Sequence, residues 1–61
     1  MRKIEIFNNR DYKDLQIEVN DWYSKHVHII VYMSRLIIDT DPGASKPYYY
    51  CIEYSEAGFL Q

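Results

Sequence analysis

Two histidines separated by one residue, His26 and His28, are the side chains best suited to metal chemistry. On a continuous strand, residues two apart point to the same face, so these imidazoles could begin a zinc or copper site. A complete site needs further ligands, which Asp39, Asp41 or Glu53 could supply if the fold brought them near. The alternative is structural, with His26 capping a helix and His28 on a half-covered strand. The sequence favours the structural alternative and predicts no metal or other cofactor.

The acidic segment Asp39-Thr40-Asp41, ahead of Pro42-Gly43, resembles a fragment of a calcium-binding loop. An EF-hand loop needs oxygen ligands at several further positions and a closing glutamate, which this segment lacks. Asp before Pro-Gly is also common turn chemistry, and Pro42-Gly43 fits the two central positions of a type II turn. We therefore predict a turn here.

The single cysteine, Cys51, excludes an intrachain disulfide and gives no sign of an oxidising compartment. A nucleophilic thiol needs activation by a neighbouring histidine or a helix N-terminus, and neither is apparent around Cys51. A buried, inert thiol is expected in its tyrosine-rich surroundings. Without another catalytic constellation, the sequence predicts a protein that is not an enzyme.

Four acidic residues follow the spacing i, i+3, i+7, i+10 and would line one ridge of a helix: Asp11, Asp14, Glu18 and Asp21. This acidic ridge, with Ile17 beside it, is the predicted partner-binding surface for an unidentified protein, which could be a basic one. An inhibitor of a host enzyme or defence complex, encoded by a phage, could dock in this way. The alternative is an ordinary solvated helix face.

Seven tyrosines could stack nucleic-acid bases or form a protein interface. Base-stacking sheets also carry basic residues, but only Arg35 and Lys46 are near the tyrosines. The net charge of −2 and the pI near 5.5 argue further against nucleic-acid binding. We therefore favour a protein interface.

Four elements position these residues. Apolar spacing at 100° per residue predicts a helix over 11–25, and alternating segments predict strands over 3–7, 27–38 and 47–55. The expected buried face of the helix comprises Tyr12, Leu15, Val19, Trp22, Tyr23 and His26. In the last strand, one face is expected to carry Tyr48, Tyr50, Ile52 and Tyr54.

The segment 27–38 has no polar face. Simple alternation would place Val27, Ile29, Val31, Met33 and Ile37 on one side, and Ile30, Tyr32, Leu36 and Ile38 on the other. One helix can cover only one side of a sheet, so the second cover would be another copy of the chain or a partner. The predicted self-association residues are Ile30, Tyr32, Tyr49 and Cys51.

The order β-α-β-β predicts an α+β fold in a single domain, 1–61, with 57–61 as a possible flexible tail. A crossover should place the first two strands parallel, in a three-stranded mixed sheet with one helix on one face. The hydrophobic fraction of 48% indicates a folded chain. No signal peptide or membrane span can be read, so a cytoplasmic protein is expected.

The sequence can be compared with two known families, one of which its N-terminus excludes. Tautomerases related to 4-oxalocrotonate tautomerase have similar length and a β-α-β outline but use an N-terminal proline as base, whereas Arg2 follows Met1 here. The segments 3–7, 14–15, 19–22 and 50–54 resemble the small sporulation-associated proteins of Bacillus and similar uncharacterised phage proteins. That resemblance implies the β-α-β-β outline and a bacterial or phage origin, and it carries no site residues.

These features predict a small interaction module, homodimeric through the outer face of its sheet. The inhibitor with an acidic ridge is the first alternative. A metal or small-ligand site at a subunit interface, built from His26, His28 and tyrosines, is the second.

Overall fold

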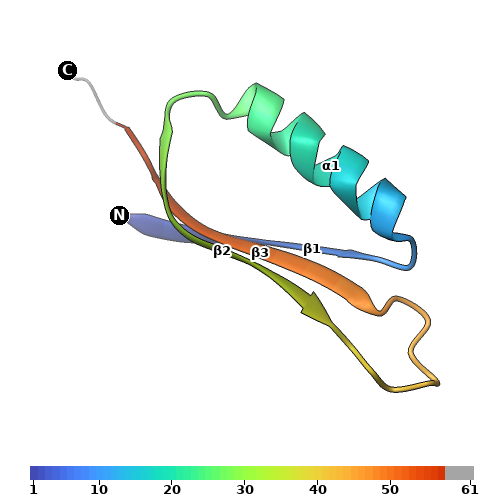
Figure 1. The fold of residues 1–61 in the computed structure, drawn as a ribbon. Helices are drawn as coiled ribbons and strands as arrows, with labels where there is room; N and C mark the ends of the chain where they lie inside the picture. Colours follow the sequence, from blue (N-terminus) through green and yellow to red (C-terminus); the bar gives the residue numbers. More distant parts are fainter. Residues whose placement is uncertain (58–61) are drawn as a thin grey trace.

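The computed structural model describes residues 1–57, which form three strands and one helix. The elements in chain order are β1 (Arg2–Asn9), α1 (Tyr12–Lys25), β2 (Ile29–Ile38) and β3 (Tyr48–Glu56). The strands form one sheet, and α1 lies along one face of it (Figure 1). The predicted α+β class and element order are confirmed. The tail expected at 57–61 lies outside the described residues from residue 58 onward.

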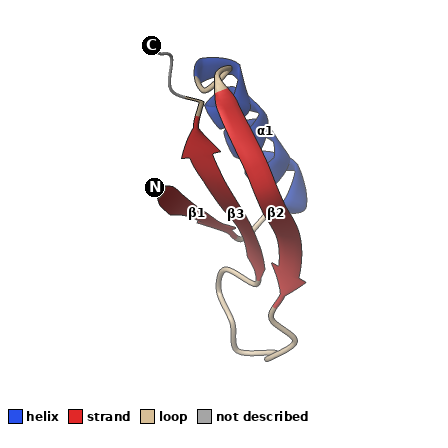
Figure 2. Cartoon of the chain, turned by 90° about the vertical axis from the view of Figure 1, so that its left-hand side faces the viewer, coloured by secondary structure: helices blue, strands red, loops and turns tan. Residues whose placement is uncertain are grey.

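The strand order is β1-β3-β2, and both pairings are antiparallel (Figure 2). β1 and β2 therefore run in the same direction, as the crossover predicts, but they are not neighbours. The predicted mixed sheet is wrong, because β3 enters between the two parallel strands and pairs with both. The result is a split β-α-β arrangement with the tyrosine-rich strand at its centre.

The helix begins and ends with local hydrogen bonds. Asp11 is the N-cap, and its Oδ1 accepts a bond from the backbone N–H of Lys13 at 2.9 Å. At the other end, the backbone N–H of His26 donates to the carbonyl of Tyr23 at 3.1 Å. Trp22, Tyr23 and His26 are half-buried as predicted for the covered face, but Tyr12 at its N-terminal end is exposed.

The hydrophobic core is a single small layer between α1 and the strands β1 and β3. Its buried members are Phe7, Leu15, Val19, Ile52 and Tyr54. The Trp22 ring closes this layer with edge contacts, at centroid distances of 6.0 Å to Phe7 and 5.0 Å to Tyr54. The predicted tyrosine face of β3 is confirmed, because Tyr48 and Tyr50 pack against the same core.

A β-bulge interrupts β2. Val31 lies opposite Tyr54 and Met33 opposite Glu53, so Tyr32 is an extra residue with no counterpart on β3. An inserted residue moves every later side chain of the strand to the opposite face of the sheet. The faces predicted from unbroken alternation are therefore wrong beyond Tyr32. The register places Ile29, Val31, Ser34, Leu36 and Ile38 on the side of α1, and Ile30, Tyr32, Met33, Arg35 and Ile37 on the other.

The loop between β2 and β3 contains the expected turn, in a different form. The backbone N–H of Ala44 donates to the carbonyl of Asp41 at 3.0 Å, which places Pro42 and Gly43 at its centre. A type II turn needs a positive φ at Gly43, but no glycine in the described residues has one. The Asp41 side chain accepts a bond from the N–H of Gly43 at 3.0 Å, so the acidic residue serves the turn.

The folded chain is flat rather than compact. Its Cα extents are 48 × 19 × 11 Å and its radius of gyration is 13.4 Å. A compact domain of this length has a radius of gyration of about 10 Å. Within residues 1–57, one helix on one side of a three-stranded sheet leaves the opposite side without a covering layer.

Candidate functional site

The sheet face opposite α1, called the outer face below, is the largest candidate interaction surface. Strand register brings side chains from all three strands onto it. Its apolar members are Ile4, Ile6, Ile30, Tyr32, Met33, Ile37, Tyr49 and Cys51. Ile4 and Ile6, on β1, are 68% and 64% exposed. A contiguous apolar surface of this kind is typical of an interaction site.

All four predicted self-association residues lie on the outer face. Ile30 and Tyr32 come from β2, while Tyr49 and Cys51 come from β3. The register therefore places them on one face, with Ile30 opposite Ser55 and Tyr49 opposite Ile37 further along the sheet, but no observation tests their role. Cys51 is half-buried, so the expectation of a buried thiol is wrong, because nothing in residues 1–57 covers this face.

Sequence reasoning missed four other residues of the outer face: Ile4, Ile6, Met33 and Ile37. The alternation of Ile4 and Ile6 was visible in the sequence, but it did not reveal that Phe7 would be the core residue of β1. Unbroken alternation places Met33 and Ile37 on the wrong side, because the bulge at Tyr32 shifts the residues that follow it to the other face.

Polar side chains close one end of the outer face. Arg2 Nη1 lies 3.2 Å from Glu53 Oε2, and the Arg2 guanidinium carbon lies 4.1 Å from the centroid of the Tyr32 ring. The Tyr32 hydroxyl is 2.9 Å from Ser55 Oγ. Further along the face, Arg35 has no ion-pair or hydrogen-bond partner within residues 1–57. The outer face therefore has an apolar middle, one unpaired guanidinium and a polar end.

A groove separates α1 from β2 on the other side of the sheet, because α1 packs over β1 and β3 only. This α1–β2 groove has a volume of about 210 Å³. Its lining residues are Tyr12, Leu15, Gln16, Val19, Asn20, Tyr23, Leu36 and Tyr50. Burial raises the pKa of the Tyr23 hydroxyl, and the charge and hydrogen bond of Tyr50 raise it further.

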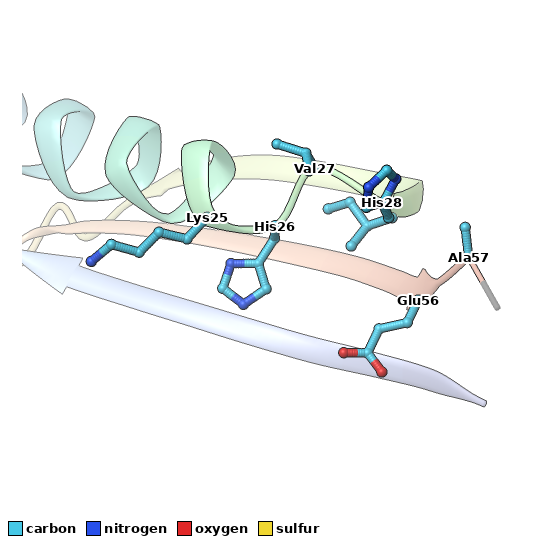
Figure 3. A pocket seen from close by; sticks show the side chains of 7 residues that line it. Lys25, His26, Val27, His28, Glu56 and Ala57 are labelled. Atoms are coloured by element: carbon cyan, nitrogen blue, oxygen red, sulfur yellow. The ribbon is translucent and has the colours of Figure 1, made fainter. Parts of the chain in front are cut away.

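A second cavity, of about 240 Å³, lies at the C-terminal end of α1 and is lined by both histidines (Figure 3). His26 Nδ1 donates to the Trp22 carbonyl at 2.7 Å, and its ring stacks on Trp22 with centroids 4.1 Å apart. His28 lies in the connection before β2, which begins at Ile29 and not at Val27 as predicted. The two rings do not converge in Figure 3. No three potential metal ligands cluster in the described residues.

The five predicted partner-binding residues on α1 and its cap are all exposed. Two acids of the acidic ridge have structural contacts, since Asp11 caps the helix and Asp21 Oδ2 lies 3.0 Å from Lys25 Nζ. Asp14 and Glu18 have no such contact within the described chain. Ile17, between them, is 66% exposed. The part of the ridge available to a partner is therefore its middle.

Comparisons with known proteins do not add a functional assignment. No model of a known protein family matches the chain. No curated protein and no solved structure matches it either. Within residues 1–57, α1 is too short and too polar to span a membrane. The resemblance to small sporulation-associated proteins stays a prediction.

Proposed function

We propose that this chain is a cytoplasmic, non-enzymatic protein-interaction module that forms a homodimer through its outer face. The observation that carries the proposal is the exposure of six large apolar side chains on one side of the sheet, each between 41% and 68%. They are Ile4, Ile6, Ile30, Tyr32, Met33 and Ile37. Water contact with these side chains is unfavourable, and packing against a second sheet would remove it.

The exposed face of the sheet can take up a second sheet. β1, β2 and β3 have eight, ten and nine residues, and no described element covers their outer face. Two outer faces packed about 10 Å apart would form a sandwich with α1 of each copy on its outside.

The composition of the outer face supports the same conclusion. Its middle is aliphatic and aromatic, and the Arg2–Glu53 ion pair lies at one end. Interface cores are depleted of charge and enriched in Tyr, Met and Arg, and their rims are polar. The unpaired Arg35 guanidinium matches that enrichment.

Light scattering over a dilution series tests the proposal. We expect an assembly of at least two copies at micromolar concentration, and we expect Ile6→Lys to halve its molar mass, because a desolvated lysine would oppose packing of the two outer faces. Ile17→Lys is the matched control, since Ile17 and Ile6 are exposed to nearly the same degree but lie on different surfaces.

Circular dichroism must show that both variants remain folded. A wild-type chain that is monomeric at every concentration would overturn the proposal. So would an Ile6→Lys variant whose molar mass equals that of the control at every concentration.

The middle of the acidic ridge is the second candidate surface, for a different partner. In the proposed dimer, α1 faces away from the contact, so Asp14, Ile17 and Glu18 remain accessible. Acidic residues around an exposed isoleucine complement a basic surface, as an inhibitor of a host enzyme or defence complex would require. If the middle of the acidic ridge binds a basic protein, the double variant Asp14→Lys/Glu18→Lys should abolish that binding. The molar mass of the free protein should not change.

A further inference from the structure

β2 has one unpaired backbone edge. It hydrogen-bonds to β3 along one side, and no described element pairs with its other side. It is also the longest strand, with ten residues. Because α1 packs over β1 and β3, the apolar side chains of β2 are exposed on both faces of the sheet.

The two edges of the sheet differ in protection. The β1 edge carries charged residues: Arg2 and Lys3 form ion pairs with Glu53 and Glu56. β2 contains no proline, and Arg35 is its only charged residue. Free edges in natural proteins normally carry charges, prolines, bulges or covering segments, because they can pair with another chain. β2 has the bulge at Tyr32 and a single charge, but it has no proline and, within residues 1–57, no covering segment, so the rest of its edge is able to pair.

The bulge makes β2 complementary to itself in one register. Opposed residues in an antiparallel pair must lie on the same face of the sheet. The side chains of β2 change faces at Tyr32. When two copies of β2 pair antiparallel about a point between Tyr32 and Met33, every residue therefore lies opposite a residue on the same face of the sheet. Val31 of one copy then lies opposite Ser34 of the other, on the helix side. Ile30 likewise lies opposite Arg35 on the outer face.

We propose that the free edge of β2 pairs antiparallel with the same edge of a second copy, about a twofold axis between Tyr32 and Met33. Two three-stranded sheets become one six-stranded sheet, in which Leu36 of each α1–β2 groove lies opposite Ile29 of the other copy. This contact uses a different surface from the proposed outer-face dimer. The edge contact and the outer-face contact together would assemble four copies, in which two six-stranded sheets stack on each other through their outer faces.

Hydrogen exchange measured by NMR tests whether the amides at the free edge of β2 are hydrogen-bonded. In a strand paired on one side only, alternate amides lack a partner and exchange rapidly. We expect consecutive amides of β2 to be protected in the assembled protein. Alternating protection at the concentration where the protein is oligomeric would overturn edge pairing and leave the outer-face proposal intact.

The Ile6→Lys variant separates the two contacts. If the β2 edge pairs, this variant remains a dimer with protected β2 amides, although its outer-face contact is lost. A monomeric Ile6→Lys variant would overturn edge pairing and support the outer face alone. A wild-type protein that is monomeric at all concentrations would overturn both proposals.

A charge exchange tests the register. In the Ile6→Lys background, Val31→Lys with Ser34→Lys places two pairs of like charges across the axis and should raise the dimer Kd about tenfold. Val31→Lys with Ser34→Glu makes both pairs opposite in sign and should restore the original Kd. Equal affinities of the two folded variants would overturn the register.

Discussion

Arg2 and Tyr32 touch across the whole width of the sheet, although they belong to its two opposite edge strands. The guanidinium carbon lies 4.1 Å from the ring centroid. The small side chain of Ser55, on the central strand opposite Arg2, lies beneath this contact and is only 8% exposed. The bulge makes the contact possible, because it adds Tyr32 to the outer face as an extra residue. This cation–π contact therefore connects β1 to β2 over β3.

The hydrogen bond beneath that contact should be measurable. Tyr32→Phe removes the partner of the buried Ser55 hydroxyl, and we expect the unfolding free energy to fall by about 1 kcal/mol. The double variant Tyr32→Phe with Ser55→Ala should recover most of that loss, because no buried hydroxyl is then left unpaired. Urea denaturation of the four proteins completes the cycle. Simple addition of the two single losses would contradict the assignment.

The core should be sensitive at Ile52, whose side chain is completely buried. We expect Ile52→Ala to cost about 2–5 kcal/mol and Ile52→Val about 0.5–1.5 kcal/mol, because each leaves a cavity. Ile17→Ala, at an exposed position of α1, should change stability by less than about 0.5 kcal/mol. Chemical denaturation gives the three values. Similar losses at Ile52 and Ile17 would show that the core is placed wrongly.

The helix cap should distinguish Asp11 from its acidic neighbours. Asp11→Ala removes the acceptor for the N–H of Lys13 and should lower stability by about 0.5–2 kcal/mol. Asp11→Asn keeps an oxygen acceptor and should lose much less. Thermal unfolding followed by far-UV circular dichroism provides the comparison. An equal loss in both variants would mean that charge, rather than capping, is responsible.

Stability should fall in alkaline solution partly through Tyr23. Its pKa in the folded chain is raised above the ordinary tyrosine value of 10.0, first by burial and then by Tyr50. Above pH 10 the unfolded chain loses this proton while the folded chain retains it, so the stability present below pH 10 declines as pH rises toward the folded pKa. Urea unfolding on both sides of pH 10 should show a smaller decline for Tyr23→Phe. An unchanged decline would exclude Tyr23 as its source.

The sequence by itself determined the local elements and the presence of an uncovered surface. The spacing of Leu15, Val19 and Trp22 defines the helix, and the apolar segment of β2 shows that both of its faces need cover. Periodicity and capping depend on neighbouring residues, so they can be read along the chain. The grouping of Tyr49 with Cys51 on one face follows from the same alternation.

Only the tertiary structure decided which surfaces these patterns produce. The position of β3 between β1 and β2 depends on competition between alternative pairings, which local sequence does not encode. The bulge at Tyr32 moved Met33 and Ile37 to the outer face, and packing under Trp22 selected Phe7 instead of Ile4 or Ile6 for the core. Each outcome depends on contacts between residues far apart in the chain. Together they left the outer face and the β2 edge uncovered by any other part of the described chain.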